Sequence, residues 1–195
     1  MQTYSHFIIT VALNKQYKDR ANSEVNTKAL LLGSFMPDIP LVLLTLIFFA
    51  QRFWFGDGVP VETVFGADYD NLYFNDPLWI TGHALFHAPP LILFSLTIGY
   101  YWGIRQNKGW AIALFWFAIG CGLHSAIDIV THHDDGPLLL FPFDWKTRFI
   151  SPISYWDNNH YAAIVASLEH LLDLVLLIWI VLARRDKSKT RKEAT

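Results

Sequence analysis

Two long runs without a charged residue constrain the fold of this chain more than any other feature. Residues 84–104 and 109–127 contain no Asp, Glu, Lys or Arg, and each is about as long as an α-helix that crosses the hydrocarbon core of a bilayer. Two further apolar runs, 27–55 and 161–183, contain a few ionisable residues. Together with the short apolar stretch at 3–14, these runs predict an all-α integral membrane bundle of about five membrane-associated helices.

The composition agrees with a small membrane protein of one domain. The 195 residues are 53% hydrophobic and only 16% charged, whereas a soluble domain carries about 25% charged residues. We expect a single membrane-embedded domain over 1–183, followed by a basic cytoplasmic tail at 184–195. The net charge of −2 excludes nucleic acid as an expected partner. The lipid bilayer is the expected partner, and the sequence carries no signal for an oligomeric state.

The basic residues predict how the helices are oriented. Twelve of the 15 lie in the C-terminal tail, the 104–109 turn and the 15–28 connection, which fall on one side of the predicted bundle. Because basic loops stay on the cytoplasmic side, we expect a multi-pass protein of the cell (inner or plasma) membrane. Its N-terminus lies outside and its C-terminus lies in the cytoplasm. The intervening 51–83 segment is long, aromatic and acidic, and is expected to be a loop.

The strongest functional signal is a stripe of three side chains at four-residue spacing. His124, Asp128 and His132 end the apolar run at 109–127, and residues at this spacing share one face of a helix. Two imidazoles and a carboxylate on one face favour a divalent metal ion. The alternative is that these side chains only cap the helix end, but capping needs one polar group rather than three.

Other ionisable residues in apolar surroundings are candidate ligands as well. His83 and His87 repeat the four-residue spacing, and spacing alone does not choose between them. Asp38 lies between Pro37 and Pro40, which can break a helix and aim a carboxylate at a cation. Near the last helix, His160 and Glu169 are further candidates, and intramembrane carboxylates are functional hypotheses by default. Each of these could instead be an interfacial or ion-paired side chain.

The depth of these residues poses a geometric problem. With a rise of about 1.5 Å per residue counted from the basic side, Asp38 would lie about 15 Å into the membrane and His124 about 24 Å. A helix tilt, or a break at Pro37, must close this gap for both to bind one ion.

In their order and spacing, five short segments resemble the YdjM-like family of membrane-bound, metal-dependent hydrolases regulated by LexA. The segments are SHFIITVAL, GSFMPDIP, HALFH, GCGLHSAIDIVTHH and LLLFPFDWKTRFISP. They cover residues 5–152. Their ligand order is also similar to that of zinc-dependent phospholipase C, an all-helical enzyme whose zinc ions cleave phosphodiesters.

These resemblances imply a metal site, a reaction and a substrate class. They imply that the residues bound directly to the metal are drawn from His6, Asp38, His83 or His87, His124, Asp128 and His132. Asp38 and Asp128 would bridge metals or orient the nucleophile, which implies catalytic roles for both. One or more divalent ions, expected to be Zn²⁺, would support hydrolysis of a phosphodiester or phospholipid. The chain lacks the His-x-x-x-Glu pair that completes the soluble enzymes' cluster, and His160 and Glu169 are the nearest substitutes.

Two alternatives to a hydrolase remain open. One is a non-catalytic membrane protein that binds or transports a metal ion or a proton, because Asp38, Glu169 and Asp173 would suit a relay. Against transport, no inverted repeat is evident in the sequence. The other alternative is a structural membrane protein whose histidines only cap helices.

Overall fold

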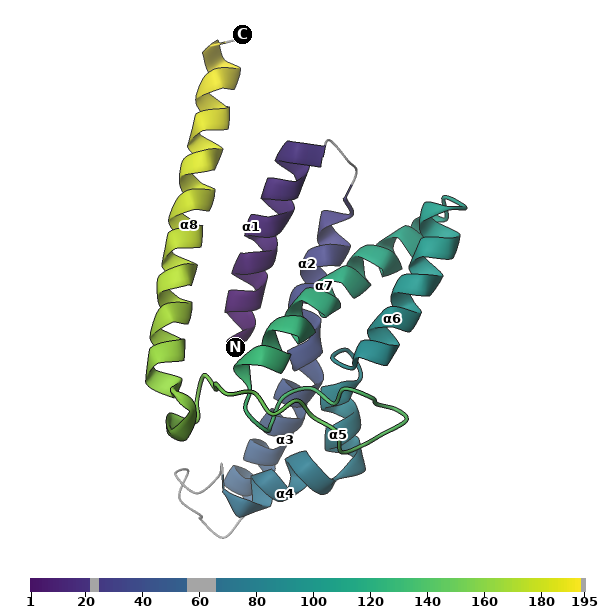
Figure 1. The fold of residues 1–195 in the computed structure, drawn as a ribbon, viewed down its shortest axis with the longest axis vertical. Helices are drawn as coiled ribbons and strands as arrows, with labels where there is room; N and C mark the ends of the chain where they lie inside the picture. Colours follow the sequence, from purple (N-terminus) through teal and green to yellow (C-terminus); the bar gives the residue numbers. More distant parts are fainter. Residues whose placement is uncertain (22–24, 56–65, 194–195) are drawn as a thin grey trace.

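The computed structural model describes residues 1–21, 25–55 and 66–193, and their arrangement is helical (Figure 1). The predicted all-α bundle is therefore confirmed. In chain order the elements are α1 (Thr3–Ala21), α2 (Thr27–Phe35), the 3₁₀ turn η1 (Met36–Asp38), α3 (Ile39–Phe55), α4 (Ala67–Asn75), α5 (Pro77–Ala84), α6 (Pro89–Ile98), the π-helical turn η3 (Gly99–Ile104), α7 (Gly109–Thr131), the 3₁₀ turn η4 (Asn158–His160) and α8 (Ala162–Glu193).

Most of the expected membrane-associated helices are long and apolar enough to cross a bilayer. Within the described residues, three segments meet this criterion: 27–54, 109–131 and 162–183. A fourth span is formed if α5 and α6–η3, which are bent by 48° at their junction, count as one broken helix. Helix α1, the fifth expected helix, is not among the candidate spans. Its second half is too polar, with Lys15, Lys18 and Arg20.

The bundle buries polar side chains and exposes apolar ones. Among its most completely buried side chains are His6, His87 and His124, whereas Leu168, Leu171 and Leu174 of α8 are more than half exposed. In water this pattern would be unstable. In lipid it is expected, because hydrocarbon solvates apolar side chains and polar groups must find partners inside the protein.

Helix α7 lies at the centre and crosses α2 at close range (Figure 1). The contact depends on Gly33 and Gly120, because a Cβ atom at Gly33 would collide with the carbonyl oxygen of Phe117, and one at Gly120 with that of Leu30. Small residues let membrane helices approach backbone to backbone. The other face of α7 packs against α6 and η3.

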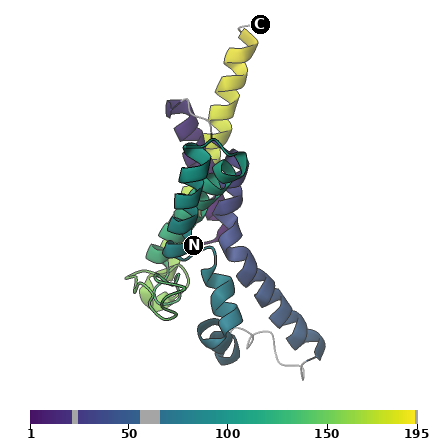
Figure 2. The same cartoon turned by 90° about the vertical axis from the view of Figure 1, so that its right-hand side faces the viewer.

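The 51–83 segment differs from the expected loop. Its first residues continue α3 to Phe55, and its second half forms α4 and α5, where Asp76 caps the N-terminus of α5. Figure 2 shows α3 extending away from the bundle, with α4 and α5 at the same end. Phe48 and Trp79 join α3 to α5 through an aromatic cluster. Residues 56–65 lie outside the described residues.

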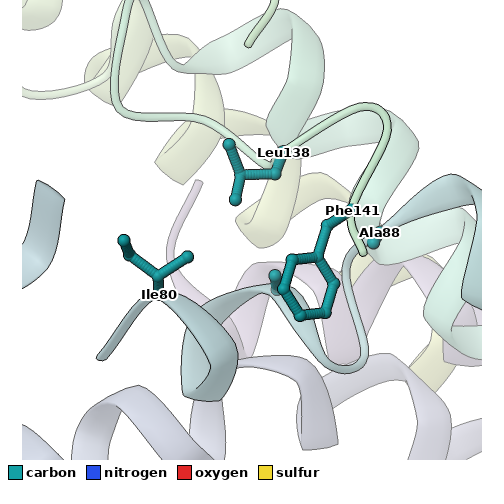
Figure 3. Packing of buried hydrophobic residues seen from close by; sticks show 5 residues of the cluster. Ile80, Ala88, Leu138 and Phe141 are labelled. Atoms are coloured by element: carbon teal, nitrogen blue, oxygen red, sulfur yellow. The ribbon is translucent and has the colours of Figure 1, made fainter. Parts of the chain in front are cut away.

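The segment between α7 and α8 closes one end of the bundle. Leu138 and Phe141 insert from this segment against Ile80 and Ala84 of α5 and against Ala88 (Figure 3). This apolar contact holds the α5–α6 junction in place, which matters because the junction carries one of the candidate ligands.

Candidate metal centre

Four of the predicted ligands converge inside the bundle. Asp38 comes from η1, His87 from the junction of α5 and α6, and His124 and Asp128 from α7. One ligand atom from each lies within 4.8 Å of all the others. His87 and His124 are completely buried and Asp128 is 4% exposed, so the group lies inside the protein rather than on its surface.

Two chain breaks explain how these residues reach one another. Pro37 interrupts the long 27–55 helical segment with the turn η1, and this turn places Asp38 beside α7. Pro89 starts α6 after a bend, and its lack of a backbone N–H suits the first turn of a helix. His87 therefore lies in a short non-helical junction. The depth difference between Asp38 and His124 is closed, since Asp38 Oδ1 lies 3.3 Å from His124 Nε2.

Backbone carbonyl groups fix the orientation of both imidazoles. The Nδ1 atom of His124 lies 2.8 Å from the carbonyl oxygen of Ser34, and that of His87 lies 2.6 Å from the carbonyl oxygen of His83. A carbonyl oxygen can only accept a hydrogen bond, so each Nδ1 carries the proton. The lone pair of each Nε2 is then directed at the two carboxylates, as in metal sites whose histidines are held by a backbone acceptor.

The two carboxylates are also held by neighbours. Thr3 donates a hydrogen bond to Asp38 Oδ2 at 2.5 Å, which leaves Oδ1 to face His87 and His124. The α-amino group of Met1 donates to Asp128 Oδ1 at 3.0 Å, while Oδ2 faces the same two imidazoles. Each carboxylate therefore offers one oxygen to the common centre.

The spacing of the ligand atoms fits a small divalent ion. The Nε2 atom of His87 lies 3.6 Å from Asp38 Oδ1 and 3.5 Å from Asp128 Oδ2; for His124 Nε2 the same distances are 3.3 and 3.0 Å. Tetrahedral zinc, with ligand bonds of about 2.0–2.1 Å, has ligand-to-ligand edges of about 3.3 Å. Both Nε2 atoms are buried without a hydrogen-bond partner, as expected of atoms that face a shared centre.

A second set of nitrogen atoms surrounds the other oxygen of Asp128. His6 Nε2 lies 3.0 Å from Oδ1 and His132 Nε2 lies 3.6 Å from it. The imidazole of His6 also stacks on that of His124, with 3.7 Å between the ring centroids. His6 and His132 therefore border the four-residue group without joining it.

The remaining candidates lie outside this group. His83 contacts the hydroxyl of Tyr73 through its ring nitrogens. His160 pairs with Asp157 and stacks on His133, with 3.5 Å between the ring centroids. Glu169 faces α1 rather than the group, and its carboxyl group contacts Ser5.

Beside the four-residue group, His132 is held by Asp135. The His132 Nδ1 to Asp135 Oδ2 distance is 3.0 Å, and Trp156 donates to the same oxygen. Burial raises the pKa of the Asp135 carboxyl, but the hydrogen bond and the charge of His132 outweigh burial and leave that pKa below its ordinary value. An ionised Asp135 therefore orients His132 toward Asp128.

Several residues of the site carry no signal in the sequence. Thr3, Ser34 and Ser125 hold ligands through a hydroxyl or a carbonyl group, and Ser125 donates to the carbonyl oxygen of His87 at 2.5 Å. A hydroxyl residue in an apolar helix is common and does not reveal its partner.

Comparison with known proteins identifies one family. The sequence model of a family described as YdjM inner membrane protein matches residues 1–190. No curated protein and no solved structure matches the chain.

Proposed function

The chain belongs to the YdjM inner membrane protein family, and from this membership and the buried His/Asp group we propose that it is a membrane-bound, metal-dependent hydrolase. Asp38, His87, His124 and Asp128 would hold one divalent ion. Zinc is the expected ion, because imidazole nitrogen and carboxylate oxygen atoms are common zinc ligands. The observation that carries the proposal is the convergence of four ligand atoms, from three parts of the chain, within 4.8 Å.

The chemistry follows from what the site can place around a substrate. A bound zinc ion supplies an acidified water and polarises the bond to be cleaved. Asp38 is the most accessible ligand, with 19% of its side chain exposed against 0–6% for the other three, so the substrate would enter on its side. Asp38 or Asp128 would orient the attacking water and accept its proton.

A phosphodiester or phospholipid is the proposed substrate class. This rests on the similarity of the ligand order to zinc-dependent phospholipase C and is an analogy between folds. The location of the group in a bundle with exposed apolar helices would give a lipid direct access from the bilayer. With the N-terminus outside, as the basic residues predict, the group would lie in the outer half of the membrane.

Metal analysis of the purified protein tests the first half of the proposal. We expect about one zinc ion per chain in detergent, lost in His124→Ala and in Asp128→Ala. His170→Ala is the matched control, since this histidine lies exposed on α8 away from the group. Full metal content in both ligand variants, or no metal in the unmodified protein, would refute the site.

Hydrolysis tests the second half and separates the enzyme from its main rival. We expect cleavage of a generic phosphodiester such as bis(p-nitrophenyl) phosphate, abolished by chelation and restored by zinc. A protein that only binds or transports a metal ion or proton would retain stoichiometric metal, show no hydrolysis, and move the ion across proteoliposomes. That result would replace the hydrolase with the rival.

A further inference from the structure

A second buried polar cluster lies on the other face of α1. Ser5 contacts two carboxyl groups of α8: its Oγ lies 2.7 Å from Glu169 Oε1 and 2.6 Å from Asp173 Oδ2. Ser5 is completely buried, and Glu169 and Asp173 are each 6% exposed. Ser5 precedes His6, and consecutive residues on a helix point about 100° apart. The first turns of α1 therefore face this cluster on one side and the metal centre on the other.

The number of hydrogen atoms available to these contacts decides whether both carboxyl groups can be ionised. A serine hydroxyl has one hydrogen to donate, and an ionised carboxylate can only accept. If both carboxyl groups were ionised, Ser5 could satisfy one of them, and its lone pair would face the other at hydrogen-bond distance. Both contacts are favourable only if one carboxyl group keeps its proton and donates it to Ser5.

A backbone contact shows which carboxyl group donates. The N–H of Gln2 donates to Glu169 Oε1 at 2.7 Å, and this is the same oxygen that contacts Ser5. An oxygen that accepts from a backbone N–H and from a hydroxyl is best ionised. The direction of the bonds is then fixed: Asp173 donates to Ser5, Ser5 donates to Glu169, and Gln2 also donates to Glu169.

The positive charge beside this cluster, the amino group of Met1, is paired with Asp128 and not with either carboxyl group. Glu169 Oε2 and Asp173 Oδ1 are buried with no hydrogen-bond partner, and in the part of the chain that the structure describes neither carboxyl group has an ion pair. The ionisable neighbours are Tyr4, whose hydroxyl contacts the exposed His170, and the amino group of Met1, which contacts Asp128. Two bare carboxylates in a membrane-spanning helix would be very costly.

We propose that Asp173, Ser5 and Glu169 form a proton-binding site in which the two carboxyl groups share one proton through the hydroxyl of Ser5. The same bonds form a relay. The proton of Asp173 moves to Ser5 Oγ while the hydroxyl proton of Ser5 moves to Glu169 Oε1. Asp173 is left as a carboxylate, Glu169 becomes the acid, and Ser5 is unchanged. Asp173 lies one helical turn, about 6 Å, further along α8 than Glu169, so the charge moves along the helix.

Infrared spectroscopy tests this site without reference to activity or metal. We expect the purified protein at neutral pH to show the carbonyl stretch of a protonated carboxylic acid, with a shift in D₂O. Asp173→Asn and Glu169→Gln should each abolish this band, because the one carboxyl group left in each variant accepts from Ser5 as a carboxylate. Asp70→Asn, which changes an exposed carboxyl group on α4, should leave the band unchanged.

The outcomes separate this site from the proposed hydrolase. Absence of the band in the unmodified protein would show both groups ionised and overturn the inference, whatever cation compensates them. Persistence of the band in both amide variants would overturn it as well. The band should survive chelation, so failure to bind zinc leaves this test intact. Loss of zinc from Glu169→Gln would place Glu169 in the metal centre and refute a separate site.

Discussion

The two faces of α1 carry buried polar sites that differ in their chemistry. On the side of α7, nitrogen and oxygen atoms alternate around a common centre, and backbone carbonyl groups hold the imidazoles. On the side of α8, the polar side-chain atoms in contact are all oxygen atoms, and a single hydroxyl lies between two carboxyl groups. Buried charge needs compensation in both places. Mixed nitrogen and oxygen ligands favour a divalent ion, whereas two carboxyl groups about one hydroxyl favour a proton.

The largest expected effect comes from separating α2 and α7. Gly33→Ala introduces a Cβ atom against the backbone of Phe117, so the helices must move apart. This displacement also moves the Ser34 carbonyl group that holds His124. We expect zinc affinity to fall by about 100-fold although every ligand is intact, while the carboxylic acid band stays. The measurement is zinc competition with a chromophoric chelator.

Gly109→Ala is the matched control, because a Cβ atom there meets nothing within 4 Å. If Gly33→Ala leaves zinc affinity unchanged, the approach of α2 and α7 does not define the centre.

Chelation should lower stability only through the metal centre. A ligand at 100 times its dissociation constant stabilises a folded protein by about 2.7 kcal/mol. We therefore expect chelator to lower the Tm by about 5–10 °C in the unmodified protein. Asp173→Asn should show the same decrease and His124→Ala none. An equal decrease in His124→Ala would mean that the chelator acts elsewhere.

Ser5→Ala should affect the α8 side alone. The change removes the hydroxyl between two buried carboxyl groups, and we expect a loss of about 1–3 kcal/mol in the free energy of unfolding, with zinc content unchanged. Denaturant unfolding in detergent measures it. Ser167→Ala, on the exposed face of α8, should cost much less. An equal cost would show that the loss in Ser5→Ala does not come from its contacts with the two carboxyl groups.

The smallest effect concerns a carboxylate exposed to water. Hydrogen bonds from the hydroxyl of Thr147 and from the backbone of Lys146 and Thr147 hold the pKa of Asp144 below its ordinary value. A carboxyl group whose pKa is lowered by folding stabilises its turn above its ordinary pKa, and this contribution is lost as the pH falls through the folded value.

We therefore expect amide exchange in 144–147, corrected for the intrinsic rate, to accelerate below the ordinary carboxyl pKa. The acceleration should be absent in Asp144→Asn. Parallel loss of the carboxylic acid band or of zinc would tie this turn to the buried sites.

Much of the fold was predictable because lipid imposes strong rules on sequence. Runs such as 109–127 without a charged residue can only be buried or lipid-facing helices. The 51–83 segment was harder, because α4 and α5 are short and gain their stability from packing, as between Phe48 and Trp79, rather than from periodicity.

The candidate site was predictable only in part. The i, i+4 spacing places His124 and Asp128 on one face, but it cannot show that the turn at Pro37 brings Asp38 to His124. Nor can it choose His87 over His83, since that depends on the bend before Pro89. Glu169 shows how far the sequence can predict a site. An intramembrane carboxylate indicates a functional site, but only the structure shows that its neighbour is Ser5.

The adjacency of Ser5 and His6 links the two sites mechanically. Both side chains project from one rigid turn, so α1 cannot rotate or slide to loosen one without disturbing the other. A ligand that shifts α1 on the side of α7 would also change the Ser5 contacts on α8. A displacement of α1 as a whole is therefore expected to weaken both sites together, whereas the loss of a single side chain such as the hydroxyl of Ser5 leaves the other site in place.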